Sequence, residues 1–153
     1  MKFKDQFSIT HGDLVRASLL ILTLATTATV AAPPGDNRQL VEMPPPMQAH
    51  MLANMREHML ALNEIMTALA ADAGDKAAGI AEQKLGMSSM AAHGADHMAP
   101  YMPEGMRKAG EAMHRAASRF ARTAQEGDRL RAYDALGEVT AACVACHGGY
   151  RIR

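Results

Sequence analysis

The only two cysteines of this chain lie three residues apart near its end, and a histidine follows the second one. Together Cys143, Cys146 and His147 form the C-x-x-C-H pattern that is typical of covalent c-type haem attachment. On a helix, Cys143 and His147 share a face and Cys146 lies beside them. Two thiols can then bond to the vinyl groups of a porphyrin while the imidazole binds its iron. The sequence therefore predicts one covalently held haem c.

Other uses of two nearby cysteines fit this pattern less well. A redox-active dithiol needs its first cysteine at the start of a helix in a βαβ unit, whereas here a helical pattern runs into the motif. A structural zinc site needs four ligands, and His93 and His97 are not accompanied by further cysteines. A disulfide between residues three apart on a helix would stabilise little. Haem attachment is the favoured interpretation.

Composition indicates one helical domain. The chain has 153 residues, including 13 methionines, three phenylalanines, three tyrosines and no tryptophan. Because aromatic side chains are scarce, a flat apolar cofactor would supply the large core piece that they normally provide. The formal net charge is zero, so the charge balance gives no sign of nucleic-acid binding.

The N-terminal region resembles a secretory signal. Residues 1–31 combine basic residues with an apolar run from Ala17 to Val30 and small residues before Ala31. Cleavage after Ala31 would release the protein into the periplasm, where its cysteine usage fits haem attachment. The chain would stay at the membrane only if this segment were left uncleaved. Residues 32–46 are predicted to be a flexible Pro-rich leader without chemistry.

Four amphipathic helices are predicted in residues 47–153. We expect the first from Pro45 or Pro46 to Ala71, the second from Asp75 as N-cap to Ser89, and the third from Pro103 to Glu126. The fourth should begin after a cap at Asp128 and carry the haem motif on its inward face. Short links and the absence of a strand signal favour an all-α, antiparallel four-helix bundle with haem near the C-terminal end of the last helix.

The extended motif C-x-x-C-H-x-x-Y-R, at the end of a four-helix chain of this length, resembles the class II cytochromes c, the cytochrome c prime and cytochrome c-556 group. The resemblance covers roughly residues 45–153 in architecture. It implies that His147 is the proximal iron ligand and that Arg151 lies near a haem propionate. It also implies that the sixth iron position is filled or left open by a residue of the first helix.

The family divides at that sixth position. Met51, with asparagine three residues later and arginine five residues later, is similar to the c-556 pattern, which implies that Met51 is the sixth ligand. Met55 is the nearest alternative. An alignment to the c prime pattern instead places Leu52 over an open iron. His50 and His58 are expected to be partly exposed residues of the polar face.

The leading functional hypothesis is therefore an exported monohaem carrier of one electron, not an enzyme, whose redox partners the sequence does not identify. A gas-binding protein, for nitric oxide, is the alternative if Leu52 covers the iron. A Met- and His-rich copper-binding protein is a further alternative, with His93, His97, Met98 and Met102 as soft-ligand candidates. The resemblance also allows a homodimer.

Overall fold

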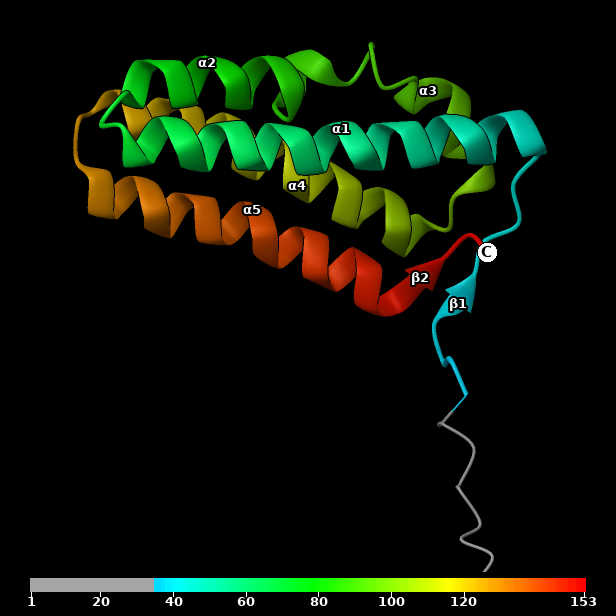
Figure 1. Cartoon of the computed structure of the whole chain (residues 1–153). Coiled ribbons are helices and arrows are strands. Elements are labelled where there is room, and N and C mark those ends of the chain that lie inside the picture. Colours follow the sequence, from blue (N-terminus) through cyan, green and yellow to red (C-terminus); the bar gives the residue numbers. More distant parts are fainter. Residues whose placement is uncertain (1–34) are drawn as a thin grey trace, which may run out of the picture. The chain divides into compact units, whose positions relative to one another are not determined.

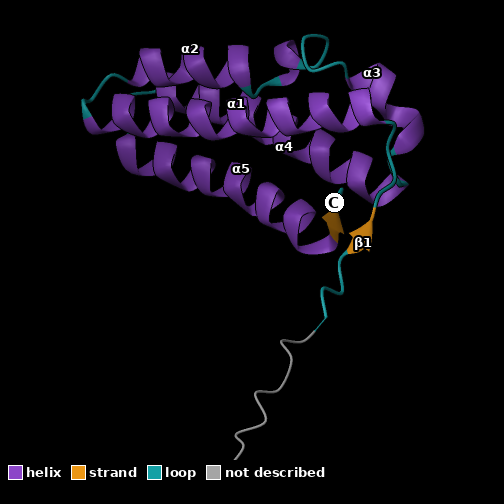
Figure 2. Cartoon of the chain, turned by 45° about the vertical axis from the view of Figure 1, so that its right-hand side comes forward, coloured by secondary structure: helices purple, strands orange, loops and turns teal. Residues whose placement is uncertain are grey.

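The computed structural model describes residues 35–153, and this part of the chain is all-α apart from one pair of very short strands (Figures 1 and 2). The expected signal segment, residues 1–31, lies outside the described residues. Three of the helices are long: α1 (Pro45–Ala70), α4 (Glu104–Gln125) and α5 (Arg129–Gly149). None of the helices in residues 35–153 combines the length and apolar character that a membrane span requires.

Helix α1 begins and ends where the sequence predicts. Pro45 occupies the first turn, where a missing N–H is tolerated, and Pro44 is the N-cap. Its buried positions recur at steps of three and four residues, which places them on one face. They are Met51, Asn54, His58, Ala61, Ile65, Ala68 and Leu69. This face contains two polar side chains, Asn54 and His58, that the prediction assigned to no function.

Helix α2 (Gly74–Lys84) is shorter than predicted, and its N-cap is Ala73 rather than Asp75. Asp75 lies inside the first turn, where its charge still favours the positive end of the helix dipole. The start of α2 approaches α4 closely, since a Cβ on Gly74 would collide with the carbonyl oxygen of Ala124. This close approach explains why a helix-disfavouring glycine is accommodated at that position.

A compact connection joins α2 to α4. It contains a 3-10 turn (Met87–Ser89), the short helix α3 (Ala95–Met98) and a second 3-10 turn (Ala99–Tyr101). Gly94 precedes α3 with φ of 63°, a left-handed conformation that glycine adopts without strain. Its missing side chain also leaves room for His50, whose Nε2 would be 2.9 Å from an added Cβ. The connection is therefore held against α1.

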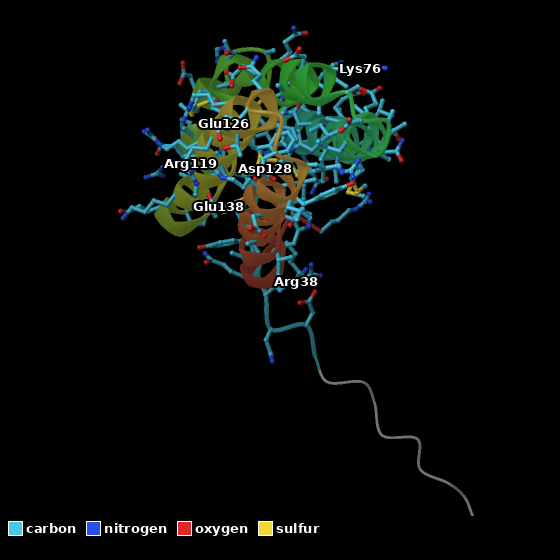
Figure 3. All side chains as sticks on the ribbon, turned by 90° about the vertical axis from the view of Figure 1, so that its left-hand side faces the viewer. Arg38, Lys76, Arg119, Glu126, Asp128 and Glu138 are labelled. Atoms are coloured by element: carbon cyan, nitrogen blue, oxygen red, sulfur yellow. The ribbon has the colours of Figure 1, made fainter. Side chains whose placement is uncertain are left out.

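The predicted boundaries of the last two helices are confirmed. Pro103 precedes α4, and the Asp128 side chain caps α5 by accepting hydrogen bonds from the backbone N–H groups of Leu130 and Arg131 at 3.0 and 3.1 Å. Arg119 of α4 and Glu138 of α5 form an exposed ion pair at 2.8 Å (Figure 3). A pair with this exposure contributes little, about 0–1 kcal/mol, so apolar packing holds the two helices together.

The main core lies among α1, α2, α4 and α5. Its largest fully buried side chains are Phe120, Ile65, Leu85 and Val139, surrounded mostly by alanines that let the helices approach closely. α4 packs against both α2 and α5, and α1 packs against α2. Towards its C-terminal end α5 slopes away from α1 (Figure 1). A second apolar cluster, built mainly from methionines, occupies that end.

The last part of the predicted leader is not a free segment. Strand β1 (Gln39–Leu40) pairs in parallel with strand β2 (Tyr150–Arg151), with Gln39 opposite Tyr150. Val41 continues the pairing by donating its N–H to the carbonyl of Arg151 at 2.8 Å, and its side chain is buried. The sequence predicts a flexible leader in residues 32–46, and in the structure backbone pairing and the burial of Val41 attach residues 39–41 to the chain end.

Candidate functional site

One cavity of about 580 Å³ brings together the residues that the sequence singles out. This volume lies within the range of about 300–1,000 Å³ that is usual for small-molecule and cofactor sites. Its walls come from α1, the connection around α3, α4, the end of α5 and the chain terminus. Residues of the predicted haem motif that line it are Cys143, Cys146, His147, Tyr150 and Arg151.

The two cysteines connect the two apolar clusters. Cys143 is half-buried against the main core, whereas Cys146 packs against the methionine cluster. Burial raises the pKa of the Cys143 thiol, and burial together with Cys143 raises the pKa of Cys146. Both sulfurs are therefore protonated at neutral pH. His147 is exposed at the edge of the cavity.

Seven methionine side chains line the cavity. They are Met51, Met55, Met90, Met98, Met102, Met106 and Met113. Met51 is the most protected candidate on α1, with 7% of its surface exposed, and it belongs to the same cluster as Cys146. Met55 and Leu52 also line the cavity but are less buried. The three α1 residues considered for the sixth iron position therefore reach one space.

Arg151 contributes a half-buried cationic side chain to the wall of the cavity. Its Nε atom is shielded from solvent and donates no hydrogen bond, although it lies 3.5 Å from the Asp36 carboxylate. We regard that contact as an ion pair whose geometry leaves the N–H unsatisfied. Asp36 also binds Arg38 at 2.7 Å, and the Arg38 side chain donates to the carbonyl of His147 at 3.4 Å. The leader thus touches the haem motif itself.

Three histidines meet in the cavity wall, and sequence reasoning missed this cluster. His58 of α1, His93 of the connection and His114 of α4 have ring centroids 4.7–5.9 Å apart. The expectation that His58 is partly exposed is wrong, because only 9% of its surface is exposed. The helical step from Met51 through Asn54 to His58 and Ala61 was the signal that could have placed it on the buried face.

Burial is the main electrostatic feature of this cluster. It lowers the pKa of His58 to about 4, with further lowering from His93, His114 and His147. Burial also lowers the pKa of His93, assisted by His114 and His50. The Nδ1–H of His114 donates to the carbonyl of Leu85 at 2.7 Å. His58 and His93 are therefore neutral at pH 7.

The residues proposed from sequence as a soft-metal cluster are not all brought together. Met98, Met102 and His93 line the cavity, whereas His97 is exposed on α3 and does not line it. His50 is partly exposed, as expected, and its Nε2–H donates to the carbonyl of His93 at 2.9 Å. Asn54 donates to the same carbonyl at 2.8 Å, which fixes the His93 backbone against α1.

The residues present fit a haem held through the C-x-x-C-H motif. Both thiols are free and line a cavity whose wall is rich in methionine. Arg151 lines the same cavity, and its solvent-shielded Nε–H could donate a hydrogen bond to an acidic substituent of the haem. Comparisons of this chain with protein-family models, with curated proteins and with solved structures found no match. The site must therefore be interpreted from its own chemistry.

Proposed function

We propose that this protein is an exported monohaem c-type cytochrome that carries one electron between redox partners and is not itself an enzyme. The observation that supports this most directly is the meeting of Cys143, Cys146 and His147 with the buried Met51 in one cavity. In this proposal α1, α2, α4 and α5 form an antiparallel four-helix bundle of the class II cytochrome c type, with haem c near the C-terminal end of α5.

Each residue has a defined role in the proposal. Cys143 and Cys146 would hold the haem covalently, His147 and Met51 would bind its iron, and the Arg151 N–H would bind a propionate. When bound, the haem supplies an iron that alternates between Fe(III) and Fe(II). A thioether ligand favours Fe(II) and so raises the reduction potential relative to two histidines.

The protein itself would exclude water from the haem and hold the ligand residues rigidly in place. The methionine cluster of Met51, Met98 and Met106 is buried, so it excludes water from this end of the molecule. Helix α5 carries both cysteines and His147 on one rigid element, which fixes their mutual positions. A fixed ligand set and a dry wall reduce the structural change that accompanies electron transfer.

The test of covalent attachment uses the full chain expressed in a bacterium with c-type haem maturation. We expect haem to remain on the polypeptide in a denaturing gel and to be absent from the Cys143→Ser/Cys146→Ser variant. N-terminal sequencing should begin at Ala32 if the signal is removed during export to the periplasm. A wild-type chain recovered from the periplasm without covalent haem would overturn the proposal.

The visible spectrum distinguishes the carrier from the gas-binding alternative. That alternative is favoured by one observation, the presence of Leu52 in the same cavity wall as Met51. A carrier whose iron is bound by both His147 and Met51 should show sharp low-spin bands in the reduced protein that do not change when carbon monoxide or nitric oxide is added. Broad high-spin bands that sharpen with either gas would instead establish an open site for nitric oxide beneath Leu52.

A further inference from the structure

The histidine cluster of His58, His93 and His114 has the dimensions of a metal site. A copper or zinc ion lies about 2.0–2.1 Å from each imidazole nitrogen, which puts the ring centres of tetrahedrally arranged histidines about 5 Å apart. The observed centroid separations are 4.7 Å for His58 and His93, 5.4 Å for His93 and His114, and 5.9 Å for His58 and His114. These three distances bracket the expected value.

Two donor nitrogens are already spaced as ligands of one ion. His58 Nε2 and His93 Nδ1 are 3.5 Å apart, against about 3.4 Å between two nitrogens on a tetrahedral ion. Without a metal, one proton between the two rings satisfies this contact. A cation could replace that proton and bind both lone pairs.

The third ring is oriented by a backbone carbonyl. The His114 Nδ1–H donates to the carbonyl of Leu85 at 2.7 Å, which leaves its Nε2 as the nitrogen with a free lone pair. Metal-binding histidines commonly use their second ring nitrogen in this way. In residues 35–153 no group of three His, Cys, Asp or Glu side chains is arranged to hold a metal ion as it stands. Binding therefore requires the His58–His93 pair and the His114 ring to move closer together while the His114 hydrogen bond to Leu85 is kept.

We propose that His58, His93 and His114 bind a transition-metal ion of the copper or zinc type, through residues other than the C-x-x-C-H motif that lines the same cavity. Imidazole nitrogens are donors that these ions prefer. Met90 and Met113 line the same cavity and add soft sulfur atoms to its wall. The three ligands come from α1, the connection and α4, so the ion would join three segments that are distant in the sequence. The proposal does not depend on the presence of haem.

The test is equilibrium dialysis of the exported protein against Zn²⁺ or Cu²⁺, followed by elemental analysis in which iron is counted separately. We expect about one bound equivalent of either ion. Affinity should fall at least tenfold in each of the variants His58→Gln, His93→Gln and His114→Gln. His97→Gln is the matched control, because His97 lies four residues from His93 but is exposed and outside the cavity, and it should bind as wild type does.

Two further measurements keep the result independent of folding and of the thiols. In the reduced wild-type protein, Zn²⁺ should shift the ring nitrogen resonances of the three histidines and not those of His97. The Cys143→Ser/Cys146→Ser variant, which cannot hold haem covalently, should keep its affinity for Zn²⁺. Lack of binding by wild type, equal loss in His97→Gln, or loss in the double cysteine variant would each overturn the proposal.

Discussion

At the scale of single residues, side chains of the same type differ in how deeply they are buried. Met51 is buried among methionines, whereas Met59 and Met66 of the same helix are exposed. His58 is buried, whereas His97 is exposed. A residue type common in the sequence therefore becomes a site candidate only where packing removes it from water.

Substituting Met51 tests its proposed role as sixth ligand. We expect Met51→Ala to convert the reduced protein from a low-spin form into a high-spin form that binds carbon monoxide, because the thioether is lost. Met55→Ala is the matched control, since Met55 lies one turn away and lines the same cavity. Visible spectra of the two reduced variants provide the comparison. A low-spin Met51→Ala protein together with a high-spin Met55→Ala protein would assign the ligand to Met55.

The lowered pKa of His58 predicts loss of stability in acid. The unfolded chain takes up a proton near the usual pKa of 6.5, whereas the folded protein resists protonation down to about 4. Stability is therefore complete above pH 6.5 and declines as the pH falls from 6.5 to 4, by about 3 kcal/mol in total.

Urea unfolding at pH 7 and pH 4.5 measures this effect. In His58→Gln the free energy of unfolding should change less between pH 7 and pH 4.5 than in wild type, because the titrating group is absent. His97→Gln should retain the wild-type difference. If His58→Gln loses as much free energy of unfolding between pH 7 and pH 4.5 as wild type does, the acid sensitivity belongs to other groups.

At the scale of elements, helix boundaries depend on short local signals. Asp128 caps α5 through two backbone N–H groups, while Asp75 lies in the first turn of α2 and makes no cap. Both aspartates precede helical patterns in the sequence, and the predictions treated them alike. The difference arises because the Gly74 contact with α4 starts α2 one residue before Asp75.

This difference has a measurable consequence for stability. Asp128→Ala should lower the free energy of unfolding by about 1 kcal/mol, because two N–H groups lose their acceptor. Asp75→Ala should cost only about 0.3–0.5 kcal/mol, through the helix dipole. Denaturant unfolding of the two variants checks the ranking. Equal losses would mean that the Asp128 cap is replaced by water at little cost.

At the scale of the whole domain, residues 35–153, the leader and the chain end form one structural unit with the cavity. The strand pair β1–β2 joins residues more than a hundred positions apart, and Arg38 reaches the carbonyl of His147. Val41 completes the methionine cluster that contains Met51 and packs against Cys146. Through Arg38 the leader is also part of the wall of the proposed haem site.

We therefore expect substitutions in the leader to affect the site. Val41→Ala should lower the free energy of unfolding by about 2 kcal/mol, since two buried methyl groups are lost and a small cavity remains. Leu40→Ala is the control, because Leu40 is exposed and should cost less than about 0.5 kcal/mol. Thermal unfolding provides the measurement. Equal stabilities would indicate that the leader packs only loosely against the chain end.

The sequence by itself determined the features that depend on neighbouring residues. The C-x-x-C-H motif, the proline starts of α1 and α4, and the Asp128 cap all lie within a few positions of the groups they act on. Helical periodicity also indicated that Met51 belongs to an inward face. Such signals are readable because local backbone sterics and hydrogen bonding largely fix them.

Only the tertiary structure decided which distant segments meet. The cluster of His58, His93 and His114 joins three segments, and the docking of Val41 joins the two ends of the described chain. The placement of Met51 and Cys146 in one cluster likewise depends on the arrangement of α1 and the end of α5 in the fold. These contacts arise from long-range burial of apolar surface, which is non-directional and leaves no spacing pattern in the sequence.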